Sequence, residues 1–155
     1  MRYPFKFVLI VFCLLWQGIL AQNRSINWTA DGTGYYSFKE GSILRNDPKT
    51  ESQTVVITKE QLTVPGSSAA LKIQSFDYSP DRNKILLFAN TTKVWRYNTR
   101  GDYWVLDIAS NKLTQLGRAR PAQSLMYAKF SPDANSVAYV YQDKSKNKVA
   151  YDRNG

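Results

Sequence analysis

The sequence predicts an all-β fold and, within that class, an incomplete β-propeller. Three observations lead to this prediction: short apolar segments recur, turn-forming residues separate them, and one pattern repeats at a spacing of about 50 residues. β-Branched and aromatic residues fill the apolar segments, whereas Asp, Asn, Gly and Pro gather between them. A chain of 155 residues is long enough for one ordinary domain.

The first segment of the chain is basic and then apolar: MRYPFKFVLIVFCLLWQGILAQ. Arg2 and Lys6 precede an uninterrupted apolar run, and small residues follow it near Ala21. This pattern predicts a signal peptide over residues 1–21 and a secreted or periplasmic protein. An uncleaved membrane anchor is the alternative, although the apolar run is shorter than the roughly 20 residues that a membrane span needs.

Residues 22–155 are predicted to form strands joined by short turns. Lys59–Leu62 alone has a helical composition, and it is too short for a stable helix. Ile85–Phe88 and Tyr103–Leu106 do not alternate with polar residues, which predicts strands buried on both faces. The predicted strands are Tyr35–Phe38, Gln53–Thr58, Ile73–Tyr78, Lys84–Ala89, Lys93–Tyr97, Tyr103–Ile108, Lys112–Leu116, Tyr127–Phe130, Ser136–Tyr141 and Lys148–Tyr151.

A turn signature repeats ahead of apolar strands. Ser79–Asp81 and Ser131–Asp133 both spell Ser-Pro-Asp, and they lie 52 positions apart. A weaker copy lies at Ile26–Gly32, where Asp31 stands 50 positions before Asp81. In such a turn proline restricts φ and aspartate bonds back to the backbone. A period of this length with about four strands per unit predicts about two and a half propeller blades, with a β-sandwich and a chance repeat as the alternative.

Composition limits what this chain can do by itself. It has no histidine, and its one cysteine, Cys13, falls in the predicted leader. A Ser-His-Asp or Cys-His catalytic centre therefore cannot be assembled from this chain, and we predict no metal site and no cofactor. The net charge is +9, but the basic residues are scattered, so no nucleic-acid partner is expected. Because a closed propeller needs at least four blades, we expect the sequence to be the N-terminal piece of a longer protein.

The stretch YSPDRNKILLFANTTKVWRYNTRGDYWVLDI, followed by AKFSPDANSVAYVYQD, resembles the N-terminal propeller of dipeptidyl peptidase IV, in the prolyl oligopeptidase family of serine peptidases. The resemblance implies an eight-bladed propeller that caps a C-terminal α/β-hydrolase domain. It implies an exopeptidase that removes dipeptides from peptide N-termini, and a full-length protein that often forms a homodimer. Residues 22–155 would gate and orient peptide substrates, while this chain alone, lacking the triad, would be inactive.

Arg96 is the candidate substrate-binding residue. It matches the arginine of the family's Trp-Arg element, which reaches into the central cavity and binds the substrate's backbone carbonyl. An arginine beside a buried strand is costly unless it is paired or faces water. We therefore expect Arg96 to face a water-filled channel, with Trp95 and Tyr97 packed against neighbouring blades. A salt bridge from Arg96 to Asp102 or Asp107 is the alternative.

The sequence also contains shorter motifs. Arg100-Gly101-Asp102 spells an integrin-binding tripeptide, but a glycine between strands more simply predicts a turn. Glycosylation sequons begin at Asn23, Asn27 and Asn90, and they matter only in a host that glycosylates exported proteins.

The alternative function is a non-catalytic exported β-propeller that serves as an interaction module. A third possibility is a truncated product that exposes apolar faces and aggregates.

Overall fold

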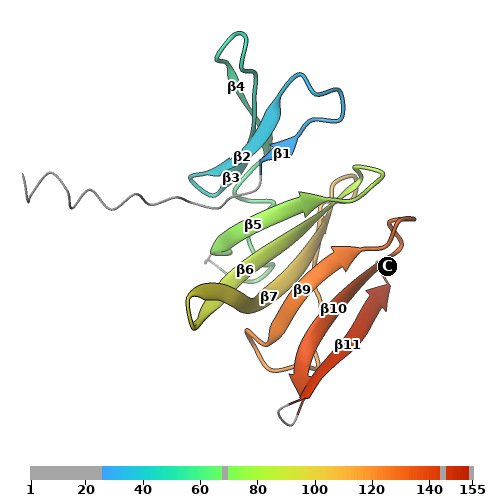
Figure 1. Ribbon diagram of the computed structural model, residues 1–155. Helices are drawn as coiled ribbons and strands as arrows, with labels where there is room; N and C mark the ends of the chain where they lie inside the picture. The colour runs from blue at the N-terminus through green and yellow to red at the C-terminus, as the bar shows by residue number, and fades with distance from the viewer. Residues whose placement is uncertain (1–25, 68–69, 144–145, 154–155) are drawn as a thin grey trace, which may run out of the picture.

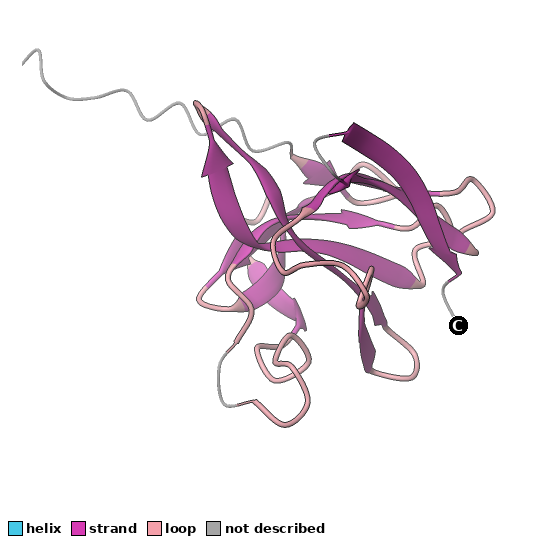
Figure 2. Cartoon of the chain, turned by 90° about the horizontal axis from the view of Figure 1, so that it is seen from below, coloured by secondary structure: helices cyan, strands magenta, loops and turns pink. Residues whose placement is uncertain are grey.

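The computed structural model describes residues 26–67, 70–143 and 146–153, and it confirms the all-β prediction. The predicted signal peptide over residues 1–21 lies outside the described residues. Within the described ranges every regular element is a strand (Figure 2). Lys59–Leu62 forms turns. No helix in this part of the chain is long and apolar enough to cross a membrane.

The strands form antiparallel sheets in which most neighbours in sequence are neighbours in space. The first sheet has the order β1 (Asn27–Trp28), β2 (Tyr35–Lys39), β3 (Ser42–Asn46) and β4 (Gln53–Ile57). It is a separate sheet from the one that the later strands, β5 to β11, form (Figure 1). Short connections between antiparallel neighbours make each sheet a local product of the sequence.

The second sheet is larger and contains two groups of strands. The first group is β5 (Ile73–Tyr78), β6 (Lys84–Val94), β7 (Tyr97–Asp107) and β8 (Lys112–Gln115). The second group is β9 (Leu125–Phe130), β10 (Ser136–Asp143) and β11 (Lys146–Arg153). One residue pair, Gly101 with Leu125, joins β7 to β9 and makes the two groups a single seven-stranded sheet.

The buried core lies on both faces of β6, as the unbroken apolar run predicts. Ile85, Leu87 and Ala89 belong to a cluster shared with Ile43 and Ile57 of the first sheet. Leu86 belongs to a second cluster, shared with residues of β9 and β10. Successive side chains of a strand point to opposite faces, so a strand covered on both sides has no place for polar residues.

Strand β7 is buried in the same two-sided way. Trp104 and Leu106 pack in the first cluster, whereas Tyr103 and Val105 pack in the second. The prediction that Tyr103–Leu106 is buried on both faces is therefore confirmed. Together β6 and β7 form the layer against which the first sheet and the β9–β11 group pack.

The three copies of the turn signature have the same hydrogen bonds. The Ser79 hydroxyl donates to the Asp81 carboxylate at 2.6 Å and accepts from the Lys84 amide at 2.9 Å. Ser131 makes the equivalent bonds to its own aspartate and to the Ser136 amide, at 2.5 and 3.0 Å. Thr29 does so in the weak first copy, at 2.6 and 2.9 Å. The internal repeat is therefore a repeat of bonding as well as of sequence.

Several predicted boundaries are wrong, and each has a physical reason. β1 and β3 were not predicted, because the first is only two residues long and the second contains Arg45 and Asn46. The predicted strands Lys84–Ala89 and Lys93–Tyr97 are a single strand up to Val94, after which the chain turns at Trp95 and Arg96. The polar residues between them lie in the outer, less buried half of β6, so polarity there does not break the strand.

The predicted turn at Arg100-Gly101-Asp102 is also wrong. All three residues lie inside β7. Gly101 is needed there for close packing: an added Cβ would meet a ring carbon of Phe88 at 2.6 Å and the backbone oxygen of Ala89 at 2.7 Å. Asp102 accepts hydrogen bonds from the Asn90 side chain and the Gln123 amide, at 3.0 and 2.7 Å. The tripeptide is thus a packed strand segment, unlike the exposed loop that adhesion motifs occupy.

Candidate functional site

Arg96 lies at the tip of the β6–β7 hairpin. Val94 pairs with Tyr97, so Trp95 and Arg96 form a two-residue turn. Trp95 has a positive φ of 61°, the conformation that a type II′ turn requires at its first central residue. Glycine is usual at that position, and a bulky residue there is uncommon. The hairpin therefore places Arg96 at a strained turn beyond the packed half of β6.

The neighbours of Arg96 do not pack as predicted. Trp95 is 93% exposed and Tyr97 is 70% exposed, so neither side chain is buried against an adjacent sheet. The reason is the length of the hairpin. The fully buried part of β6 ends at Ala89, and the strand continues beyond it for five residues, to Val94. The prediction that Arg96 lies beside a buried strand is therefore wrong. β6 is buried only as far as Ala89, and Arg96 lies beyond that part of the strand.

A cavity of about 730 Å³ lies between the first sheet and the outer half of the β6–β7 hairpin, and Arg96 lines it. Lys93 is the second cation in its lining, and no carboxylate of the described residues lines it. The aromatic side chains in the lining are Tyr35, Tyr36, Phe38, Phe76, Phe88 and Tyr97. Aromatic walls with a few polar groups are typical of ligand sites.

Arg96 is available to bind a ligand. It makes no hydrogen bond or ion pair with the described residues. The two aspartates that the sequence offered as partners lie farther along β7, where Asp102 is opposite Ala89 and Asp107 is opposite Lys84 at the far end of the hairpin. Asp102 accepts from Asn90 and Gln123, and Asp107 accepts from the amide and hydroxyl of Ser110, at 2.8 and 2.7 Å. The predicted alternative, a salt bridge that holds Arg96 in place, is therefore absent from this part of the chain.

The geometry supports binding and not bond cleavage. A guanidinium presents fixed donors that suit a carbonyl or carboxylate oxygen. Ser37 and Ser75 line the cavity, but the chain has no histidine to act as a base for either hydroxyl. Tyr36 in the lining packs against Tyr78, with the two ring centroids 4.7 Å apart. The cavity can thus hold and orient a molecule that carries an oxygen acceptor.

Two of the predicted sequons are used in the fold. The Asn27 side chain donates to the backbone oxygen of Phe76 at 2.6 Å and so links the first sheet to β5. The Asn90 side chain donates to Asp102 at 3.0 Å. The third sequon, at Asn23, lies outside the described residues. Sequence reasoning missed Asn27 as a residue that holds the wall of the cavity, because its partner is 49 positions away.

Comparisons with known proteins show what this chain is similar to. Residues 79–144 match the family model described as "Dipeptidyl peptidase IV (DPP IV) N-terminal region". The matched range includes two of the three turns, the β6–β7 hairpin and Arg96. The predicted resemblance to this N-terminal region is therefore confirmed.

Similarity extends over most of the chain. "Probable dipeptidyl-aminopeptidase B" of Aspergillus oryzae is 32% identical over 125 residues, which cover 79% of this chain and 13% of that protein. "Probable dipeptidyl peptidase 4" of Aspergillus fumigatus is 30% identical over 121 residues, or 75% of this chain and 14% of that protein. The chain thus spans only a small part of the length of the relatives it matches.

A solved structure shows a similar fold. The crystal structure of Porphyromonas gingivalis dipeptidyl peptidase 4 matches with a TM-score of 0.59 and 19% identity, over 83% of this chain and 19% of that chain. The antiparallel sheets described above thus correspond to part of the propeller of a dipeptidyl peptidase 4.

Proposed function

We propose that residues 22–155 are the N-terminal part of the propeller of a dipeptidyl peptidase IV-like serine exopeptidase, and that they gate and orient peptide substrates. The observation that carries the proposal is the unpaired Arg96 at the exposed hairpin tip, in an aromatic cavity that no described carboxylate lines. The names of the fungal relatives, a dipeptidyl-aminopeptidase and a dipeptidyl peptidase, indicate the reaction class.

The strand groups support a propeller with blades like those of the family. Strands β1–β4, β5–β8 and β9–β11 each begin with a strand that runs into one of the repeated turns. An array of about two and a half blades cannot close, so the rest of the ring belongs to the full-length protein. The exposed apolar side chains of Val149 and Tyr151 on β11 would then pack against the following strands.

In the proposed mechanism Arg96 binds and a separate domain reacts. The Arg96 guanidinium donates to a backbone carbonyl of the peptide and holds the peptide's N-terminal end in the cavity. A C-terminal α/β-hydrolase domain supplies the serine, histidine and aspartate, since this chain holds no histidine. The chain alone is therefore inactive. Export through the signal peptide at residues 1–21 brings the enzyme to secreted or periplasmic peptides.

The test uses the full-length product of the reading frame that contains this sequence. Purified enzyme is assayed with a chromogenic dipeptide substrate that has proline in second position, and Arg96→Ala is compared with Arg82→Ala. A charge-assisted hydrogen bond contributes about 1.5–3 kcal/mol, so Arg96→Ala should lower kcat/KM by roughly 10- to 150-fold. Arg82 lies at the opposite end of β6, so its loss should leave kcat/KM nearly unchanged.

Three outcomes count against the proposal. A frame without a hydrolase domain, or a full-length protein without dipeptidyl peptidase activity, would favour the exported interaction module. Equal activity of Arg96→Ala and the parent enzyme would remove Arg96 from substrate binding while leaving the family assignment intact. A matched loss in both arginine variants would indicate a structural effect. N-terminal sequencing of the exported protein tests cleavage after Ala21 separately.

A further inference from the structure

The outer half of the β6–β7 hairpin extends beyond the buried core and carries Arg96 at its tip. The pairing of β6 with β7 is interrupted twice in this region, between Ala89 and Thr92 and between Thr92 and Lys93. Asn90, at the first interruption, has a positive φ of 49°. Such irregularities bend a strand and disrupt its ladder locally. The direction in which the tip points is therefore not fixed by the β6–β7 pairing alone.

Three consecutive residues at the base of this outer half join β7 to the β9–β11 group. The first is Arg100, whose guanidinium Nη2 donates to the Gln142 Oε1 atom of β10 at 2.5 Å. The second is Gly101, which pairs with Leu125 and so places β9 beside β7 (Figure 1). Both contacts reach strands that lie well beyond the hairpin in sequence. We call residues 100–102 the brace.

Asp102 is the third residue of the brace, and it contacts segments on two sides. One carboxylate oxygen accepts from the Gln123 amide, in the loop before β9, at 2.7 Å. The other accepts from the side chain of Asn90 on β6 at 3.0 Å. One carboxylate thus joins the place where β6 is interrupted to the loop that leads into the next group of strands.

Arg100 is costly for the folded state. Its side chain is half-buried, and its Nε atom is buried without a hydrogen-bond partner in the described residues. A buried N–H without a partner destabilises a folded protein, because it has lost its hydrogen bond to water. The bond to Gln142 is the one hydrogen bond that the guanidinium makes in this part of the chain. An arginine kept at such a cost indicates a role other than stability.

The brace is well placed to control the position of Arg96. Arg96 precedes Arg100 by four residues, so at a rise of about 3.3 Å per residue the tip lies roughly 13 Å beyond the brace. A tilt of the outer half by about 10° would then move Arg96 by roughly 2 Å. Misplacement of a binding group by about 1 Å can lower a reaction rate by as much as about 100-fold.

We propose that the brace is a positioning element, which fixes the hairpin to the β9–β11 group and so holds Arg96 where the carbonyl of a bound peptide meets it. Neither Arg100 nor Gln142 lines the cavity that contains Arg96, so both act through the position of the hairpin. This inference rests on the proposed function of Arg96. It gives the Arg-Gly-Asp tripeptide a role inside the molecule.

The experiment uses the full-length enzyme and breaks the brace at its exposed end. Gln142→Ala removes the acceptor of the Arg100 bond and should lower kcat/KM roughly 3- to 10-fold. Gln142→Glu offers a carboxylate to the same guanidinium and should keep kcat/KM close to that of the parent enzyme. Gln115→Ala on β8 is the matched control, because the Gln115 side chain makes no hydrogen bond in the described residues; it should leave kcat/KM unchanged.

A double-mutant cycle with Arg96 separates positioning from a general structural effect. In an Arg96→Ala enzyme, Gln142→Ala should cause no further loss of kcat/KM, because no guanidinium is left to position. Equal losses with and without Arg96 would overturn the proposal, since they would show that Gln142 affects the whole propeller. A loss in Gln142→Glu as large as that in Gln142→Ala would overturn it too.

Hydrogen exchange gives a readout that does not depend on activity. The backbone amides of residues 92–99 should exchange about threefold faster or more in Gln142→Ala, while those of β2 and β3 should not change. Unchanged exchange over residues 92–99 would overturn the proposal. Equal kcat/KM in Arg96→Ala and the parent enzyme would refute the proposed function instead, and the exchange rates would then show by themselves whether the brace holds the hairpin.

Discussion

The two turns at the ends of β6 differ in what their side chains do. The turn before β6, Ser79–Lys84, uses its hydroxyl and carboxylate to bind its own backbone. The turn after β6, Trp95–Arg96, has exposed side chains, and Arg96 has no partner in the described residues. One turn therefore maintains the fold, whereas the other offers a cation to a ligand. Polar residues in a turn indicate function only when their hydrogen-bonding groups are not already satisfied.

The largest effect is expected from Ser79→Ala. Ser79 is 1% exposed. Its hydroxyl donates to the Asp81 carboxylate and to the Lys84 backbone oxygen, and it accepts from the Lys84 backbone N–H. Removal leaves buried groups without a partner, so the free energy of unfolding should fall by about 1–3 kcal/mol. Urea denaturation measures this loss. Ser136→Ala is the control, because the Ser136 hydroxyl makes no hydrogen bond in the described residues; a similar loss there would contradict our view of the turn.

Acid should destabilise the protein through the same turns. Hydrogen bonds from Thr29, Ser79 and Ser131 are the main reason that the pKa values of Asp31, Asp81 and Asp133 lie below the ordinary value. Because the folded pKa is depressed, the stabilisation is complete above the unfolded pKa of about 3.9 and is lost as the pH falls through the folded pKa.

The measurement is the urea midpoint as a function of pH. The three aspartates should leave the urea midpoint nearly constant between about pH 5 and 7. At pH values below about 4 their protonation should lower the midpoint. Asp133→Asn removes one titrating group and should make the fall less steep. An unchanged slope in Asp133→Asn would show that other carboxylates cause the acid sensitivity.

The smallest effect is expected from Trp95→Gly at the hairpin tip. Glycine relieves the positive φ of 61°, and little packing is lost from a side chain that is 93% exposed. The greater freedom of glycine in the unfolded chain opposes this gain, so the free energy of unfolding should change by less than about 1 kcal/mol. A loss as large as that of Ser79→Ala would show that the two turns have similar structural roles.

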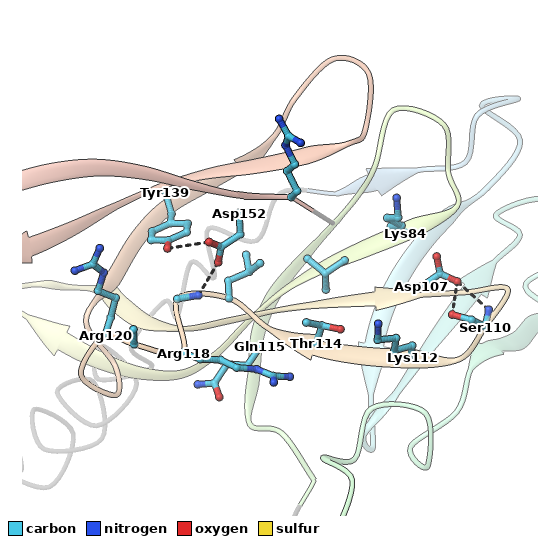
Figure 3. Close-up of a pocket in the computed structure, with 15 residues that line it drawn as sticks. Lys84, Asp107, Ser110, Lys112, Thr114, Gln115, Arg118, Arg120, Tyr139 and Asp152 are labelled. Atoms are coloured by element: carbon cyan, nitrogen blue, oxygen red, sulfur yellow. Dashed lines mark hydrogen bonds between the residues drawn. The ribbon is translucent and has the colours of Figure 1, made fainter. Parts of the chain in front are cut away.

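The burial of two strands outside the turns was also predictable from the local sequence. The apolar runs at Ile85–Phe88 and Tyr103–Leu106 predicted two-sided burial, and both runs are buried in that way. Arg96 was predicted to bind substrate because it matches the arginine of the family's Trp-Arg element. In the structure it lines a cavity. The cavity of about 780 Å³ between β7–β8 and β10–β11 (Figure 3) was not predicted, because its lining comes from segments as far apart as Lys84 and Arg153.

The sequence by itself determined the all-β class, the repeated turns and the similarity to the N-terminal region of dipeptidyl peptidase IV, because each depends on residues close together in the chain. The hydrogen bonds of a Ser-x-Asp turn join groups within six residues of one another. An unbroken apolar run predicts a strand that is buried on both faces, whichever segments cover it. Tertiary structure decided the rest. Gly101 lies in a strand at a place where the Phe88 ring and the Ala89 oxygen leave no room for a side chain. Arg96 does not pair with Asp102 or Asp107, because it lies at the hairpin tip, whereas Asp102 is opposite Ala89 and Asp107 is opposite Lys84 at the other end of the hairpin. Such outcomes depend on which distant groups meet, and local pattern carries no information about that.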